Sequence, residues 1–179
     1  MDDVDKHGLG DHYRDNRDAA NGAIGGAAAP RLRVAAFIPV NDSVLLVSQQ
    51  RDAERHGSAY WLLPGGGVSF GESLHDALDR ELREELGLAV HLMDPIALVE
   101  SISPDPAYRK HVIHIIVAAT APDVDAALGV AAADPAVLTA RFFRADELEG
   151  LELRPPLAPF LRRRLLTPST EFEYLGRLW

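Results

Sequence analysis

The stretch from residue 65 to residue 88, GGGVSFGESLHDALDRELREELGL, constrains the fold more than any other part of the chain. Four leucines recur at intervals of four residues and predict an amphipathic helix that runs to Leu86. Either Ser69 or Ser73 can cap the start of this helix, and Gly87 suits the left-handed position after its end. The stretch therefore predicts a glycine turn followed by a well-bounded helix.

Three glutamates of this predicted helix do not lie on its solvent-facing side, where exposed charged residues would be expected. At about 100° per residue the two aspartates of the helix point away from the leucines, whereas Glu81, Glu84 and Glu85 share or border the apolar stripe. Half-buried carboxylates this close repel one another and raise each other's pKa values. A hard divalent cation such as Mg²⁺ relieves both costs because it prefers oxygen ligands. The alternative is an exposed helix edge with salt bridges to neighbouring arginines.

Three consecutive glycines, Gly65 to Gly67, follow Pro64 at the end of the short predicted strand WLLP. Glycine permits positive φ angles and close approach of the backbone to a ligand, so a main-chain carbonyl here can become a further metal ligand. A plain loop is the alternative. A phosphate-binding loop of the lysine-serine type is excluded because no Lys-Ser or Lys-Thr pair follows the glycines.

Taken together, these residues resemble the Nudix hydrolase family, whose pattern is G-x5-E-x7-R-E-u-x-E-E-x-G-u with u a large apolar residue. Every fixed position is filled. In chain order the matching residues are Gly66, Glu72, Arg80, Glu81, Leu82, Glu84, Glu85, Gly87 and Leu88. The match covers a short stretch, and the strand order from about residue 31 to residue 165 is compatible with it.

The resemblance implies a fold and a reaction. The implied fold is of the α/β class, an α/β/α sandwich with a mixed β-sheet in which the motif forms a loop-helix-loop. The implied reaction is hydrolysis of the pyrophosphate bond in a nucleoside diphosphate linked to another moiety, with Mg²⁺ or Mn²⁺ as cofactor. A nucleotide-sensing module that binds without cutting, and a structural interaction domain, are the competing classes.

The resemblance also implies roles for single residues. Glu81, Glu84 and Glu85 would hold the metal, with the carbonyl of Gly65 as a further ligand. Glu81 is alternatively the base that deprotonates water. Arg80 would orient the glutamates by charge-assisted hydrogen bonds. Glu72, which the pattern also includes, is expected to be a structural residue outside the metal ligands.

The rest of the chain predicts a single domain with two flanking segments. Residues 1–30 are rich in Asp, Gly and Ala and predict a flexible or weakly ordered arm, or one that docks on a partner subunit. Residues 31–166 form the predicted domain. Residues 167–179 are expected to pack on this domain or across a homodimer interface. Further strands are predicted in RLRVAAFIPV, SVLLVSQQR, AVHLMDPIALVES (broken at Asp94-Pro95), HVIHIIVAATA and VLTARFFRA, and short helices in DELEGL and PPLAPFLRRRLL.

Composition limits the partners. The net charge of −9 argues against general binding to nucleic acid or anionic membranes, which requires a basic face. No apolar run approaches a membrane span of roughly 18 residues. The chain has no cysteine, which excludes disulfides and thiolate sites and fits a reducing compartment. With no recognisable signal peptide at its start, the expectation is a cytoplasmic protein with a small nucleotide substrate.

The substrate is predicted less closely than the reaction. In the family, a proline about 16 positions past the motif accompanies ADP-ribose hydrolysis, and Pro104 fits that position; its alternative is an ordinary surface turn. This favours ADP-ribose or another nucleoside diphosphate sugar, with nucleoside triphosphates second. Tyr108 lies close to where enzymes of dinucleoside polyphosphates place a tyrosine. Arg51, Arg109 and Lys110 can meet phosphate or face solvent, and Tyr60 and Trp61 can stack on a base or join the core.

Overall fold

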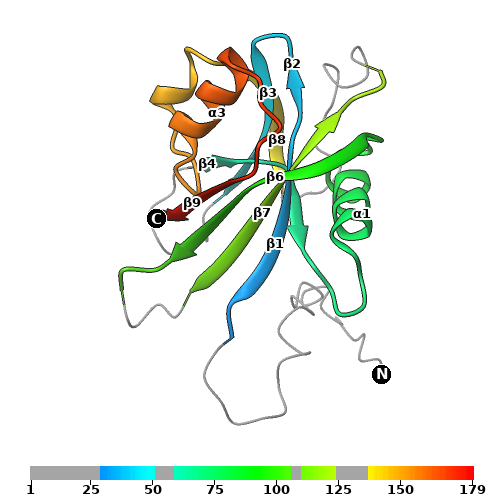
Figure 1. The fold of residues 1–179 in the computed structure, drawn as a ribbon, viewed down its shortest axis with the longest axis vertical. Coiled ribbons are helices and arrows are strands. Elements are labelled where there is room, and N and C mark those ends of the chain that lie inside the picture. The colour runs from blue at the N-terminus through cyan, green and yellow to red at the C-terminus, as the bar shows by residue number, and fades with distance from the viewer. Residues whose placement is uncertain (1–28, 51–58, 106–109, 124–136) are drawn as a thin grey trace, which may run out of the picture.

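The structure is a computed structural model, and it describes residues 29–50, 59–105, 110–123 and 137–179. Its strands form two sheets, and helices cover them from two sides (Figure 1). None of the helices in these ranges is both long and apolar enough to cross a lipid bilayer.

The larger sheet has five strands of mixed direction. Their order across the sheet is β5-β1-β7-β6-β9. Strands β1 and β7 are parallel, as are β6 and β9, whereas β5 runs antiparallel to β1 and β6 antiparallel to β7. The strands are β1 (Arg31–Phe37), β5 (Gly65–Gly67), β6 (His91–Ile102), β7 (His111–Thr120) and β9 (Glu173–Arg177).

The smaller sheet is antiparallel and follows directly from the first strand of the larger one. The chain leaves β1 at Phe37, passes through Ile38 and enters β2, which turns at Asn41 into β3. Asn41 has a φ of 54°, a left-handed conformation that asparagine tolerates in turns. The strands are β2 (Pro39–Val40), β3 (Ser43–Gln50), β4 (Ala59–Leu62) and β8 (Val137–Arg144), with β8 paired to β3.

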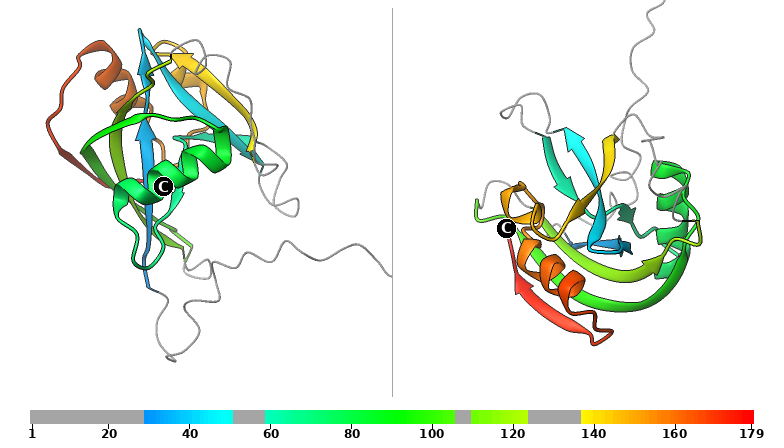
Figure 2. Two further views of the ribbon diagram at one scale, coloured as in Figure 1. Left: turned by 90° about the vertical axis from the view of Figure 1, so that its right-hand side faces the viewer. Right: turned by 90° about the horizontal axis from the view of Figure 1, so that it is seen from above.

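Two helices lie on opposite sides of the larger sheet, as two views at right angles show (Figures 1 and 2). Helix α1 (Leu74–Leu86) buries its leucines in one apolar cluster with Val34 and Ala36 of β1. Helix α3 (Ala158–Leu166) buries Phe160 and Leu161 in a second cluster on the other face, close to the short 3-10 helix η2 (Leu148–Gly150). Alternate residues of β1 enter the two clusters, as the period of two in a strand requires. The predicted α/β sandwich with a mixed sheet is thus confirmed.

Both ends of α1 have the predicted capping residues. The hydroxyl of Ser73 accepts a hydrogen bond from the backbone N–H of Asp76 at 3.1 Å. Gly87 is left-handed with a φ of 63°, and the N–H of Leu88 closes the last turn on the carbonyl of Leu82 at 3.2 Å. Local capping chemistry therefore sets the bounds of the helix that carries the glutamates.

Two expectations about other elements are corrected. The strand with Asp94-Pro95 is continuous as β6, because register shifts on both sides of Pro95 absorb the missing N–H donor of proline. Helix α3 begins at Ala158, after the two prolines at 155 and 156, because residues 152 to 154 pair with Trp61 of β4. The segment after residue 166 contains strand β9, which was not predicted because its sequence, EYLGR, lacks the alternation of apolar and polar residues typical of a strand.

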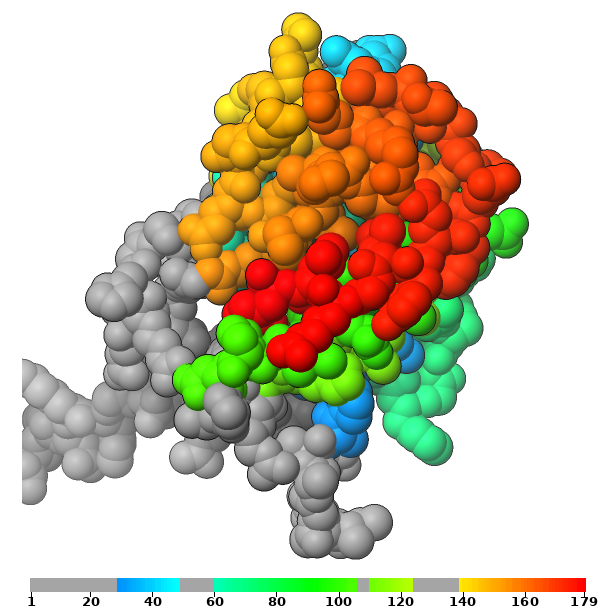
Figure 3. Space-filling view, turned by 60° about the vertical axis from the view of Figure 1, so that its left-hand side comes forward, coloured from blue at the N-terminus to red at the C-terminus, as the bar shows by residue number. Residues whose placement is uncertain are grey.

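Strand β9 forms one edge of the larger sheet and places the last residues of the chain beside β6. It pairs in parallel with β6, and the N–H of Leu178 donates to the carbonyl of Glu100 at 2.8 Å. Figure 3 shows the C-terminal segment, in red, lying along β6, in green. Arg164 of α3 is 3 % exposed and ties this segment down, with its guanidinium 2.7 Å from a carboxylate oxygen of Glu173.

Candidate functional site

The site begins where the glycine strand β5 crosses helix α1. A Cβ atom on Gly66 would lie 1.9 Å from the carboxyl carbon of Glu81, so a larger residue there would displace this carboxylate. Gly65 has a φ of 134°, and a Cβ there would lie 2.4 Å from the carbonyl oxygen of Val34. The N–H of Gly65 donates to Glu85 at 3.1 Å. The glycine turn therefore serves to bring backbone against two carboxylates of α1.

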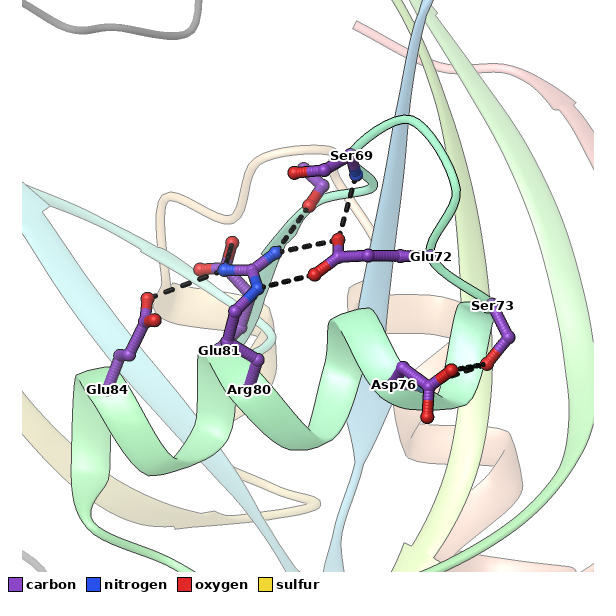
Figure 4. A network of polar contacts seen from close by, with 8 residues as sticks. Ser69, Glu72, Ser73, Asp76, Arg80, Glu81 and Glu84 are labelled. Atoms are coloured by element: carbon purple, nitrogen blue, oxygen red, sulfur yellow. Dashed lines mark hydrogen bonds and ion pairs between the residues drawn. The ribbon is translucent and has the colours of Figure 1, made fainter.

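Arg80 is the centre of the polar network on this helix (Figure 4). Its Nε and Nη2 donate to the two carboxylate oxygens of Glu72 at 2.8 and 3.0 Å, a bidentate pair. Its Nη1 donates to Glu81 at 2.8 Å and to Glu84 at 3.4 Å. Its Nη2 also donates to the carbonyl of Gly67 at 3.2 Å. One guanidinium thus joins three carboxylates to the glycine strand.

The electrostatics of the network follow from these contacts. The hydrogen bonds from Arg80 and from the N–H of Ser69 lower the pKa of Glu72 to about 2. Conversely, Glu72 first and then Glu81 raise the pKa of Arg80 above its usual value. Glu72 is therefore ionised at neutral pH and holds the guanidinium of Arg80 in place.

The three glutamates differ in burial. Glu81 and Glu85 are 3 % and 6 % exposed, whereas the side chain of Glu84 is 56 % exposed. The angular positions on the helix placed all three at or beside the apolar stripe. Glu84 lies furthest from the centre of the stripe, and its contact with Arg80 leaves its carboxylate open to solvent.

The donor set fits a hard divalent cation in its chemistry. Three carboxylates, those of Glu72, Glu81 and Glu84, share the single positive charge of Arg80, and Glu85 lies on the same helix one turn from Glu81. This excess of negative charge on oxygen donors is what Mg²⁺ or Mn²⁺ would offset. Within the described residues, no three Asp, Glu, His or Cys side chains already converge as a preformed metal cluster. The carboxylates are instead held by Arg80 and by the N–H of Gly65.

A cavity of about 480 Å³ adjoins this network. Gly67 belongs to both, because it lines the cavity while its carbonyl accepts from Arg80. The walls come from β1, β4, β6 and β7, from residues 152 to 155, and from the last residue of the chain, which follows β9. The lining residues are Arg31, Leu32, Arg33, Tyr60, Leu62, Gly67, Ser101, Lys110, Val112, His114, Glu152, Leu153, Arg154, Pro155 and Trp179.

The cavity is basic although the chain is acidic. Its lining has four cationic side chains and one carboxylate, whereas the whole chain carries a net charge of −9. Two of the cations lie over aromatic rings. Lys110 Nζ is 5.9 Å from the ring centre of Trp179, and Arg154 Cζ is 5.0 Å from that of Tyr60.

His114 lies at the inner wall of this cavity, in register with Arg33 of β1. It is 9 % exposed, and its Nε2 has no hydrogen-bond partner among the described residues. Burial, helped by the positive charges of Arg33 and Lys110, lowers its pKa to about 3. His114 is therefore neutral at neutral pH, and the histidine adds no charge to the cavity.

The predicted substrate-binding residues are only partly located. Arg51 and Tyr108 lie outside the described residues. Pro104 lies in a bend after β6 and is not one of the residues that line the cavity. Ser101 and Lys110, at the two ends of that loop, do line it.

The sequence contains a signal for two further cavity residues that are not among the predicted site residues. Arg31 and Arg33 alternate at the start of an otherwise apolar strand, so both point to the same face. Two arginines on the same face of a strand gather positive charge there, which suits the binding of an anion. Glu152 and Arg154 gave no such signal, because their place depends on the pairing of residues 152 to 154 with β4.

Known proteins share this sequence pattern and this fold. The family model described as NUDIX domain matches residues 29–165. An ADP-ribose pyrophosphatase of Methanocaldococcus jannaschii is 31 % identical over 87 residues, which cover 49 % of this chain and 48 % of that protein. The nucleoside triphosphatase NudI of Escherichia fergusonii is 47 % identical over 47 residues, or 26 % of this chain and 33 % of that protein.

Among solved structures, a NUDIX hydrolase from Nitrosomonas europaea superposes with a TM-score of 0.63 at 21 % identity, covering 80 % of this chain and 93 % of that one. At that identity the likeness shows the fold. The matched segments span half or less of the length of the two curated relatives.

Proposed function

This chain belongs to the NUDIX domain family, and from that premise we propose that it hydrolyses the pyrophosphate bond of a nucleoside diphosphate linked to another moiety, with Mg²⁺ or Mn²⁺ as cofactor. The observation that carries the proposal is the buried carboxylate of Glu81, seated against Gly66 and held by Arg80 together with two further carboxylates. A helix with a purely structural role has no need of this arrangement, since it concentrates negative charge against the backbone of a glycine strand.

The residues have the following proposed roles. Glu81, Glu84 and Glu85, with the carbonyl of Gly65, would hold the cation. Glu81 is alternatively the base that takes a proton from the attacking water. When bound, the cation would neutralise the pyrophosphate and acidify that water. Arg80 keeps the glutamates oriented while Glu72 fixes the guanidinium.

The proposed substrate is ADP-ribose or another nucleoside diphosphate sugar. Pro104, at its position past the motif, supports this choice, and so does the relative named ADP-ribose pyrophosphatase. Nucleoside triphosphates are the second candidate, because the relative with 47 % identity over its matched segment is named a nucleoside triphosphatase. A module that binds nucleotides without cutting them is the third candidate.

A substrate panel separates these candidates. The full chain is incubated with ADP-ribose, nucleoside diphosphate sugars and nucleoside triphosphates in Mg²⁺ or Mn²⁺, and products are resolved by ion-exchange chromatography. We expect release of a nucleoside monophosphate that stops on addition of EDTA. Nucleotide binding without any product in either metal would instead identify a sensing module.

Two variants test the assignment of roles. Glu84→Gln and Glu85→Gln remove a negative charge and keep the size of the side chain. We expect each to reduce turnover by at least about a hundredfold, since charge stabilisation at one catalytic group is typically of that order. Far-UV circular dichroism and melting temperature should stay close to those of the wild type. Unchanged turnover in both variants would overturn the proposed roles of these glutamates.

A further inference from the structure

The basic cavity next to the glycine strand has a ligand chemistry of its own. It adjoins the acidic network through Gly67, which lines the cavity and whose carbonyl accepts a hydrogen bond from Arg80 at 3.2 Å. The two regions have opposite charge. A ligand that spans both must present phosphate to the cations of the cavity and to a metal at the carboxylates.

The cations converge on the cavity from separate parts of the chain. Arg31 and Arg33 come from one face of β1, and Lys110 from the residue before β7. Arg154 is already paired with Glu152 at 2.6 Å. The guanidinium of Arg31 makes no hydrogen bond or ion pair with any described residue. An excess of positive charge on a concave wall attracts an anion and raises its local concentration.

The aromatic rings supply the second half of the site. Trp179 is 49 % exposed although Lys110 lies against its ring, so ring surface remains for a ligand. Tyr60 belongs to β4 and lines the same cavity with Leu62. Aromatic side chains next to cations are the usual means of holding a base and its phosphate together, because the base stacks while the phosphate pairs.

We propose that this cavity holds the nucleoside monophosphate half of the substrate, with Trp179 stacking on the base and with Arg31 and Lys110 contacting its phosphate. The proposal deepens the proposed hydrolase function and rests on it. It makes Trp179 and Lys110 residues that determine affinity and specificity, while the glutamates of α1 remain responsible for the reaction. Its test is therefore a binding experiment that needs no turnover.

The first measurement uses the tryptophans as reporters. The chain has two, and Trp61 packs edge-on against Phe143 with ring centres 4.5 Å apart, outside the cavity lining. The variant Trp61→Phe leaves Trp179 as the single reporter. It is titrated in EDTA with AMP, with adenosine and with inorganic phosphate. We expect AMP to quench the fluorescence and to bind at least about tenfold more tightly than either fragment, with affinity falling as salt rises.

The second measurement uses matched variants and calorimetry. Lys110→Gln is compared with Arg162→Gln, which also removes one positive charge but from the exposed face of α3. Trp179→Leu is compared with Phe172→Leu, since Phe172 is 57 % exposed and lies outside the cavity lining. We expect each cavity variant to weaken AMP binding about tenfold or more, as loss of one stacking contact typically does, and each control to bind as the wild type does.

The outcomes separate the two proposals. AMP binding that depends on Lys110 and Trp179, in a chain that hydrolyses nothing, would support the cavity and overturn the hydrolase. Hydrolysis with KM unchanged in Lys110→Gln and Trp179→Leu would support the hydrolase and overturn the cavity. Equal affinity for AMP and inorganic phosphate would also overturn the nucleotide assignment, since the rings would then have no role. In the expected result the cavity variants raise KM and leave kcat nearly unchanged.

Discussion

The carboxylate of Glu81 rests directly on the backbone of Gly66, with a gap too small for a single methyl group. The contact joins residues 15 positions apart in the sequence and brings the carboxylate of α1 against β5. It also gives the most direct test of the candidate site.

Gly66→Ala should therefore damage the site more than the neighbouring Gly67→Ala. An added Cβ at Gly66 would meet the Glu81 carboxyl group at 1.9 Å, whereas one at Gly67 would have nothing within 4 Å. We expect Gly66→Ala to reduce turnover about a hundredfold, because displacing a catalytic group by about 1 Å can cost that much. The loss of unfolding free energy should be about 1–3 kcal/mol, as in other overpacked sites. Equal behaviour of the two variants in activity and denaturant unfolding would show that the contact has no such role.

Replacing Glu72 by Gln should weaken the clamp on Arg80 and give a defined pH signature. The folded-state pKa of Glu72 is about 2, below the ordinary value of 4.5. A lowered pKa means that ionised Glu72 stabilises the fold above about pH 4.5 and that this contribution is lost as the pH falls towards 2. The difference in melting temperature between wild type and Glu72→Gln should thus be constant from about pH 5 to pH 7 and shrink below about 4.5.

The control for this experiment is Asp79→Asn. Asp79 pairs with Arg83 at 2.8 Å on the exposed face of α1, away from β5. An exposed pair of this kind contributes little, so its removal should change the melting temperature less than Glu72→Gln does. A Glu72→Gln difference that stays constant down to about pH 2 would contradict the lowered pKa.

His114 should make the stability of the protein depend on pH in a higher range than Glu72 does. Its pKa in the folded state is about 3, compared with 6.5 for an ordinary histidine, because it is buried beside Arg33 and Lys110. The unfolded chain therefore binds a proton that the folded chain does not, and stability present above about pH 6.5 is lost as the pH falls towards 3. One such proton gives a slope of at most about 1.4 kcal/mol per pH unit.

His114→Gln should flatten this part of the curve. The measurement is the free energy of unfolding by urea at several pH values between about 4 and 7, compared with the wild type and with a variant of the exposed His91. We expect the slope to fall in His114→Gln and to stay as in the wild type in His91→Gln. An NMR titration in which the His114 ring protonates near its ordinary pKa of 6.5 would refute the prediction.

Arg164 should be necessary for stability in a way that its neighbour Arg162 is not. Arg164 is 3 % exposed, donates to the carbonyl of Ile96 at 3.3 Å and pairs with Glu173 at 2.7 Å. Breaking a buried pair leaves the partner groups unsatisfied, so Arg164→Met should reduce the free energy of unfolding by about 3 kcal/mol. Arg162→Met removes an exposed pair with Glu149 and should cost less than about 1 kcal/mol. Similar losses in the two variants, measured by denaturant unfolding, would contradict the role assigned to Arg164.

Much of the helix and its acidic residues could be predicted from sequence. The signals that define α1 are local in the sequence: the leucine spacing, the cap at Ser73 and the glycine at 87. The bounds of α1 can therefore be predicted without any knowledge of tertiary contacts. The angular positions also anticipated that Glu81 and Glu85 would face inwards. For Glu84 the same reasoning went too far, because burial at the edge of a helix depends on how far the covering strand extends.

The order of the strands and the basic cavity required the folded structure. Residues as distant as Arg31, Tyr60, Lys110 and Trp179 line one wall only after β1 pairs with β7, residues 152 to 154 pair with β4, and β9 pairs with β6. Periodicity and capping arise from neighbours along the chain and can be recognised in the sequence alone. Strand pairing joins segments whose separation in sequence carries no record of their contact, so the tertiary structure alone decided where the cations and the rings meet.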